Sequence, residues 1–361
     1  MAGSQYQYQI EVFNAQNQLI HQSQVTSDWL LACEAARFQM LREGAGASTG
    51  EEISPVWHPE AGAPHISGVR VAATNAQGRI ATVDIPLAYF RPFAQRVGQS
   101  LVAHGRLVEG EEFVYLVNAY PIESDATNKP IAALTLERIA TSPIHGMRPL
   151  RELANQVDIT VGTGDQAFPV FVPRSILAEA EKLKQDAGGV ETGGILIGRL
   201  FQDPGSMIPF SEITAFLPAR FTTADATRLT FTPETWSDAR AAIDLRGRGE
   251  SWLGWVHTHP ARFWCKCSEI EKKVNCPFSE KFFSADDALL HRSVFYGAHH
   301  IAIVLGDEYR PESGWQTHFY AYGWRSAVIE ARSVFVVGDA PRLREEERAT
   351  NWGDVSCKTV A

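Results

Sequence analysis

The sequence predicts an α+β protein built from two domains, and three observations lead to this prediction. Its 361 residues exceed the roughly 250–300 at which one hydrophobic core stops growing. Hydrophobic residues make up 45% of the chain and charged residues 21%, which excludes wholesale disorder, collagen and coiled coil. Strand-like and helix-like periodicities are mixed in both halves of the chain. We therefore expect domains at 1–150 and 157–335, followed by a charged, disordered tail at 338–361.

The first domain is predicted to begin with a hairpin, because 6–13 alternates polar and apolar residues before a polar turn at 14–18. A helix follows, since its apolar side chains recur at helical spacing. The predicted elements are strands at 6–13 and 19–25, a helix at 28–42, a loop at 44–68, strands at 69–74 and 80–85, a helix at 88–103 and a strand at 113–119. No cluster of catalytic residue types occurs here, so the sequence assigns this domain no role. Residues that interrupt helices and strands, at 128–130 and 142–143, predict that 124–151 is a connector. Within it, 131–136 could form a strand.

The second domain is predicted to alternate strands with helices. Pro173 suits the first turn of a helix whose apolar face carries Ile176, Ala180 and Leu183, and a pair of glycines stops it at 188–189. A second and a third helix are expected at 234–245 and 284–295. The predicted strands are 168–172, 192–200, 210–217, 253–257, 301–305 and 317–322.

Charge and hydropathy exclude two classes of partner. Lys and Arg total 33 against 42 Asp and Glu, for a net charge of −9, and no basic run stands out to neutralise a row of phosphates, so we expect no nucleic acid. No stretch reaches the roughly 18 apolar residues that span a bilayer, and the first residues lack the pattern of a secretory signal. We therefore expect no membrane association and a cytoplasmic location.

A candidate zinc site is predicted where the strand at 253–257 ends. His257 and His259 are separated by one residue, so both imidazoles point to one face of the strand and can reach one ion. Ser284 and Asp287 are three apart at the start of a predicted helix and can share a helical face. Two histidines and a carboxylate leave a fourth tetrahedral position for water, which is the composition of a catalytic zinc site.

A hydrolytic zinc site also needs a base that is not a metal ligand. Glu191 is the best candidate, because it is a carboxylate directly before an otherwise apolar, glycine-containing strand. Taken alone, Glu191 would be interpreted as a solvated charge at a strand end.

Together these residues resemble the JAMM motif of the JAB/MPN family of zinc metalloproteases. The motif consists of Glu191 before Gly-Gly-Ile-Leu-Ile-Gly, then His-Thr-His-Pro at 257–260, then Ser284 and Asp287. The resemblance is to the deubiquitinating members and covers roughly 157–335. It implies a cytidine-deaminase-like sheet flanked by helices, one Zn²⁺, and hydrolysis after the C-terminal glycine of ubiquitin or a ubiquitin-like modifier.

The resemblance also implies a role for each matching residue. His257, His259 and Asp287 would bind zinc, Glu191 would activate water and protonate the leaving amine, and Ser284 would hydrogen-bond the oxyanion. Asp286 is the rival carboxylate, but the Ser-x-x-Asp spacing favours Asp287.

The chain departs from the family pattern in a long insert at 261–283, which holds three of the five cysteines. Cys265, Cys267 and Cys276 could bind a second, structural zinc, with a histidine such as His291 or His299 as fourth ligand, or could be three reduced thiols. The insert borders the predicted active site, so it could act as a lid or bind the substrate's tail. Its aromatic residues Trp264 and Phe278 are the candidates for substrate binding.

Three functions remain open at this stage. The first is a zinc isopeptidase like the stand-alone JAB proteins of bacterial ubiquitin-like conjugation systems, with a ubiquitin-like protein or its conjugates as substrate and the pathway's activating or conjugating enzymes as further partners. The second is a peptidase that processes a ubiquitin-fold sulfur-carrier protein. The third is a non-catalytic MPN-type scaffold, against which the intact Glu191 argues. The sequence does not indicate which modifier is cut, whether the bond is an isopeptide or a linear peptide, or the oligomeric state.

Overall fold

The structure is a computed structural model, and it describes residues 3–4, 6–26, 28–122, 143–162, 168–219, 222–225, 228–279 and 281–338. The chain divides into two compact units. The first comprises Met1–Ser142 with Tyr296–Ala298 and Trp324–Ile329, and the second holds the remainder from Pro143 on. Both units combine helices with sheets, which confirms the predicted α+β class. The strand expected at 131–136 and the tail beyond 338 lie outside the described residues.

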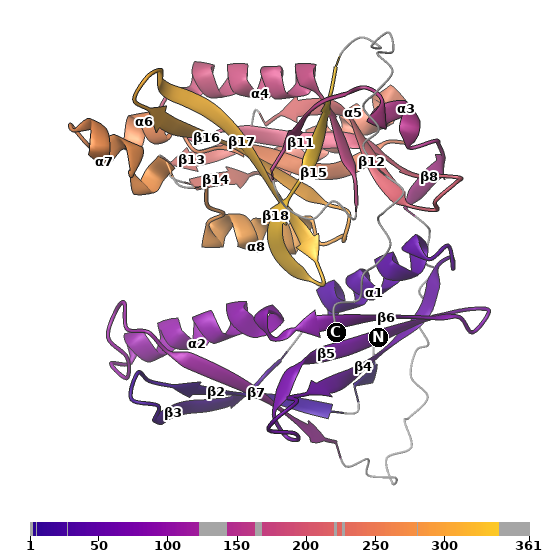
Figure 1. The fold of residues 1–361 in the computed structure, drawn as a ribbon, viewed down its shortest axis with the longest axis vertical. Helices are drawn as coiled ribbons and strands as arrows, with labels where there is room; N and C mark the ends of the chain where they lie inside the picture. Colours follow the sequence, from indigo (N-terminus) through magenta and orange to yellow (C-terminus); the bar gives the residue numbers. More distant parts are fainter. Residues whose placement is uncertain are drawn as a thin grey trace. The chain divides into compact units, whose positions relative to one another are not determined.

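The first unit contains two sheets and two longer helices (Figure 1). One sheet has the order β1, β4, β5, β6 and the other the order β3, β2, β7. Helix α1 packs against β4, β5 and β6, and α2 packs against β2. The elements are β1 (Gly3–Ser4), β2 (Tyr6–Phe13), β3 (Leu19–Gln24), α1 (Leu30–Arg42), β4 (Ser48–Trp57), β5 (Ile66–Asn75), β6 (Ile80–Pro86), the 3₁₀ turn η1 (Leu87–Phe90), α2 (Arg91–Ala103) and β7 (Val114–Pro121).

The loop predicted at 44–68 is wrong, because β4 occupies ten of its residues and β5 begins at Ile66. Only Ser48 and Ile53 of this strand are buried, so its sequence lacks the alternation that marks a strand. Pro55 is tolerated because β4 has a paired neighbour on one side only at this position. Pro55 pairs with Val69 of β5, whereas among the described residues the pairing of β4 with β1 ends at Ile53. The other predicted elements of this unit are confirmed to within a few residues.

The second unit is built around a sheet of ten described strands. Nine follow the order β18, β17, β16, β15, β11, β12, β10, β19, β9, and β8 pairs with the end of β11. Strand β15 lies between β11, to which it is antiparallel, and β16, to which it is parallel. The strands are β8 (Ile144–Met147), β9 (Val157–Val161), β10 (Val170–Pro173), β11 (Gly193–Gln202), β12 (Pro209–Pro218), β15 (Ser251–Thr258), β16 (Ile301–Arg310), β17 (Gly314–Arg325), β18 (Val328–Arg332) and β19 (Val334–Val337). A separate hairpin pairs β13 (Thr222–Asp225) with β14 (Arg228–Phe231).

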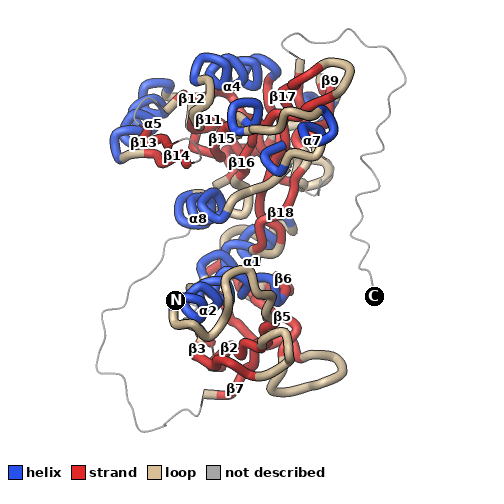
Figure 2. Tube along the Cα trace, turned by 90° about the vertical axis from the view of Figure 1, so that its left-hand side faces the viewer, coloured by secondary structure: helices blue, strands red, loops and turns tan. Residues whose placement is uncertain are grey.

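Helices cover both faces of this sheet. Helix α4 (Arg174–Ala187) packs against β10, β11, β12 and β16, and Figure 2 shows α8 (Ala285–Val294) on the opposite side of the sheet. Trp255 of β15 shares a core cluster with side chains of α5 (Pro233–Arg246) and α8. The smaller helices are α3 (Arg151–Ala154), α6 (Ala261–Trp264), α7 (Ile270–Val274) and the 3₁₀ turn η2 (Pro277–Ser279). Among the described residues, no helix is long and apolar enough to cross a bilayer.

The predicted strands and helices of the second unit are confirmed, and three features were not predicted. The connector interpretation of 124–151 is wrong for 144–147, where β8 pairs with β11, and for Arg151, where α3 begins. Strands β9, β13, β14, β18 and β19 were also missed; each has only four or five residues. Finally, the buried face of α4 includes Lys184, whereas Leu183 is only partly buried.

Candidate metal centre

Strand β15 delivers the two predicted histidine ligands from the middle of the sheet. His257 and His259 are almost completely buried, with 0% and 2% of their surface exposed. The ring of His257 stacks on Trp255, two residues earlier on the same face, with ring centroids 4.3 Å apart. A Cβ atom on Gly254 would overlap the carbonyl oxygen of Ile301, so glycine lets β16 approach closely beside the histidines.

Helix α8 delivers the carboxylate through a capping box. The Ser284 hydroxyl accepts a hydrogen bond from the backbone N–H of Asp287 at 3.1 Å, and the N–H of Ser284 donates to Oδ2 of Asp287 at 2.8 Å. The predicted pairing of these two side chains on one helix face is therefore confirmed, and its physical origin is the helix N-terminus. Asp286 is exposed, whereas Asp287 is buried beside the histidines.

The three side chains converge with the spacing of ligands around one ion. Nε2 of His257 lies 3.1 Å from Nε2 of His259 and 3.3 Å from Oδ1 of Asp287, and the second oxygen of Asp287 lies 3.6 Å from His259. Atoms about 2.0–2.1 Å from a tetrahedral zinc ion are about 3.3–3.4 Å from one another. The two distances to Asp287 end on different oxygens, and each side chain offers a donor atom within 4.8 Å of the others, so the set fits a divalent metal after small side-chain movements.

Protonation also favours metal binding. Burial acts to raise the pKa of Asp287, but the neighbouring histidines and Ser284 outweigh it and hold that pKa below its usual range. Burial lowers the pKa of His259, so its imidazole is neutral near pH 7 and has a lone pair for a metal. Its other ring nitrogen, Nδ1, lies 3.2 Å from the hydroxyl of Tyr320 on β17.

Glu191 lies beside this cluster without belonging to it. It is 5% exposed, and its Oε1 is 3.9 Å from Nε2 of His259. Burial, followed by the charges of Asp287 and Asp286, raises the pKa of Glu191 to about 8. Its position is fixed by Thr192, which exchanges two hydrogen bonds with Thr258 between the two histidines, at 3.0 and 2.9 Å. A buried carboxylate that exchanges a proton near neutral pH is suited to general base catalysis.

The insert brings aromatic side chains to the same place. Phe282 stacks on His259 with centroids 4.4 Å apart, and the ring of Trp264 lies 6.0 Å from His259. The indole N–H of Trp264 donates to the carbonyl of Gly189 at 3.2 Å, just before Glu191. Phe278 packs against Trp264 at 5.8 Å and is 42% exposed. The structure therefore places Trp264 at the cluster and Phe278 beside Trp264.

The three insert cysteines form a second group of possible ligands, with sulfur atoms within 4.8 Å of one another. The structure places neither His291 nor His299 in this group, so the predicted fourth ligand is wrong. His291 instead accepts a hydrogen bond from the indole N–H of Trp255 at 3.2 Å, and the ring of His299 packs on His300.

Two features of the site were not predicted. Tyr320 comes from β17, which is distant in sequence from the histidines. The sequence around Tyr320 has no pattern that indicates its contact with His259. Asp307 on β16 receives Lys184 from α4 and Arg262 from α6, the latter through three hydrogen bonds of 3.0–3.2 Å. The available signal was the position of Lys184, which follows Ile176 and Ala180 at intervals of four on the apolar face of its helix.

No protein family model matches the sequence, and no curated protein is similar to it. Among solved structures, the solution structure of a protein from Desulfitobacterium hafniense has 15% identity and a TM-score of 0.32, and the match covers 47% of this chain and 94% of that protein.

Proposed function

We propose that this chain is a zinc-dependent peptidase that hydrolyses the bond after the C-terminal glycine of ubiquitin or a ubiquitin-like modifier. The observation that carries the proposal is the buried carboxylate of Glu191 next to, but outside, a cluster of two histidines and one aspartate. A structural metal site would need no such base. The choice of substrate rests on the resemblance of these residues to the JAMM motif.

Each side chain has a defined role in this reaction. His257, His259 and Asp287 would hold the zinc ion, which when bound polarises the scissile carbonyl and lowers the pKa of water. Glu191 takes the proton from the attacking water and returns it to the leaving amine. The Ser284 oxygen already accepts a hydrogen bond from the helix backbone, so its hydroxyl proton is available to donate to the oxyanion.

The proposed partners follow from this activity. They are a ubiquitin-like protein or its conjugates, and the activating or conjugating enzymes of the same pathway in the cytoplasm. Whether the bond is an isopeptide or a linear peptide is an outcome of the substrate panel below.

The test uses the full chain, its zinc content, and a panel of ubiquitin-like fusions with linear and isopeptide linkages. Glu191→Gln should keep zinc and lose about 10²–10⁴-fold in activity. Ser284→Ala should keep zinc and lose about 10²–10³-fold. Glu179→Gln makes the same change at an exposed position of α4 and should cleave normally. Normal cleavage by Glu191→Gln would refute the mechanism, and loss of zinc in it would make Glu191 a ligand.

A second control addresses the substrate class. If the wild-type protein held zinc but cleaved no fusion in the panel while hydrolysing unrelated peptides, the chemistry would stand and the assigned substrate would be wrong. If the wild-type protein held zinc and hydrolysed nothing, the scaffold alternative would replace the enzyme.

A further inference from the structure

The insert between the metal-ligand cluster and α8 has almost no core of its own. Within 262–279, Cys276 is the single buried residue, at 2% exposure. Helix α7 buries none of its residues, and Ile270 and Val274 on it are 54% and 41% exposed. Segments that bury so little apolar surface are usually held by a disulfide or a metal ion.

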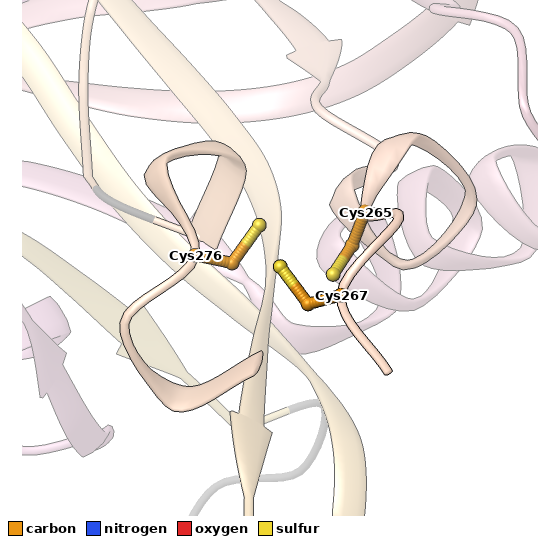
Figure 3. A group of neighbouring side chains, drawn as sticks. All are labelled: Cys265, Cys267 and Cys276. Atoms are coloured by element: carbon orange, nitrogen blue, oxygen red, sulfur yellow. The ribbon is translucent and has the colours of Figure 1, made fainter. Parts of the chain in front are cut away.

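The three cysteines of the insert gather at one point. Figure 3 shows Cys276 facing Cys265 and Cys267 across the space between the two ends of the insert. None of these three forms a disulfide, and their sulfur atoms lie within 4.8 Å of one another. Sulfur atoms about 2.3 Å from a tetrahedral zinc ion are about 3.8 Å apart, so small side-chain movements suffice to bind one.

Hydrogen-bonding and positively charged groups act on the sulfur of Cys265, whereas the hydrogen bond with Cys265 raises the pKa of Cys267 to about 11. The backbone N–H of Cys267 donates to the sulfur of Cys265, and the positive charge of Lys273 acts on the same sulfur. Lys266 lies between the first two cysteines in sequence. Three thiolates select a soft or borderline ion such as zinc over magnesium or calcium.

The cysteines lie close in sequence to two aromatic residues of the insert, Trp264, which contacts the catalytic cluster, and Phe278, which contacts Trp264. Cys265 directly follows α6, whose Trp264 reaches His259 and Gly189. Cys276 directly precedes η2, whose Phe278 packs against Trp264. An ion bound by all three cysteines would therefore hold the rings of Trp264 and Phe278 in place near Glu191.

We propose that Cys265, Cys267 and Cys276 bind a structural zinc ion that clamps the insert against the catalytic cluster. In the described part of the chain no fourth His, Cys, Asp or Glu joins the group. This site is separate from the histidine site, and it does not depend on the proposed peptidase activity.

The test is replacement of zinc by cobalt, which gives a near-ultraviolet thiolate-to-metal charge-transfer band only when sulfur is a ligand. The wild-type chain should bind two ions and show this band. His257→Ala with His259→Ala should lose one ion and keep the band, whereas a triple Cys→Ser variant at 265, 267 and 276 should lose the other ion and the band. Cys33→Ser, at an isolated buried cysteine of the first unit, should change neither.

Proteolysis reports the clamp itself. Metal removal should make trypsin cut faster after Lys266, Lys272 and Lys273, and this change should be absent in the triple variant, which is already cut fast. If the triple variant does not fold, the cobalt spectrum of the wild type and of the double-histidine variant decides alone. Absence of the band, or recovery of a disulfide among these cysteines from protein purified without oxygen, overturns the proposal.

Discussion

The hydroxyl oxygen of Tyr320 lies 3.2 Å from Nδ1 of His259. Nε2 of the same ring faces the ligand cluster, so with a metal bound there the proton is on Nδ1 and donates to Tyr320. This contact fixes the tautomer and the orientation of the ring. It connects the segment just after β15 with β17, on the far side of β16.

Tyr320→Phe should therefore weaken metal binding or activity by about 10–100-fold while the fold is retained. The measurement is zinc affinity by competition with a chelator. Tyr322→Phe is the matched control, because it removes a hydroxyl from the same strand. That hydroxyl donates to the carbonyl of Lys281 and not to a predicted metal ligand. Equal affinities for the two variants would show that Tyr320 only packs.

The ligand assignment has its own test. His257→Ala combined with His259→Ala should remove one zinc ion per chain, because both donors of the sheet are lost from one site. Elemental analysis of the purified protein measures it. The double variant and the protein with both histidines are compared after the three insert cysteines have been replaced in each. The protein with both histidines should then hold one zinc ion per chain, and the double variant should hold none. Retained zinc in that background would place the metal elsewhere.

Local patterns account for much of this site, and long-range contacts account for the rest. His257 and His259 follow from strand periodicity, and the pairing of Ser284 with Asp287 follows from helix capping, so both are readable in short stretches of sequence. The proximity of Glu191 to His259 instead depends on the register of β11 against β15, in which Gly193 pairs with His257. Periodicity does not supply that register, and only the resemblance to the JAMM motif indicated it.

The fold shows the same division. Long strands with runs of buried residues, such as β11 and β16, were predicted, whereas β19 was missed because its buried run is only four residues long. Strand β4 was missed because it buries two residues of ten. Asp307 and its cationic partners were missed because three different elements bring them together.

Trp264 and Phe278 should contribute to substrate binding. Trp264 lies near His259 and Phe278 packs against Trp264, and Phe278 is 42% exposed, so a modifier tail can contact it. Replacing both by alanine should lower turnover of a modifier fusion by about tenfold, equivalent to about 1.4 kcal/mol of binding energy, and leave catalytic zinc in place. Ile270→Ala, at an exposed apolar residue of α7, is the control. Wild-type rates for the double variant would make these rings structural packing.

Lys184 should stabilise the second unit far more than its neighbour Lys182. Lys184 and Asp307 have 1% and 0% of their side chains exposed, whereas Lys182 pairs with Asp186 at the surface, 74% and 64% exposed. Lys184→Met leaves the buried Asp307 with Arg262 alone and should lower the free energy of unfolding by about 3 kcal/mol. Lys182→Met should change it by less than about 0.5 kcal/mol. Urea unfolding measures both, and similar values would contradict the assignment.

Glu250 should make stability depend on acid pH. Its carboxylate is fully buried, accepts two hydrogen bonds from Arg246 at 2.5 and 2.9 Å, and accepts a third from Thr214 at 2.5 Å. The hydrogen bonds from Arg246 outweigh burial and lower the pKa of Glu250 from 4.5 to about 2. Because the folded pKa lies below the unfolded one, this stabilisation is present above about pH 4.5 and is lost as the pH falls towards 2.

The shift corresponds to at most about 3 kcal/mol at neutral pH. Glu250→Gln should therefore be less stable than the wild type at pH 7, and the difference between the two should shrink steadily between about pH 5 and pH 2. Asp238→Asn, which removes an exposed carboxylate from α5, the helix that carries Arg246, should follow the wild-type curve. The free energy of unfolding in urea, measured across this range for all three proteins, decides: a constant gap between Glu250→Gln and the wild type would mean that the carboxylate keeps its ordinary pKa and that Arg246 contributes packing alone.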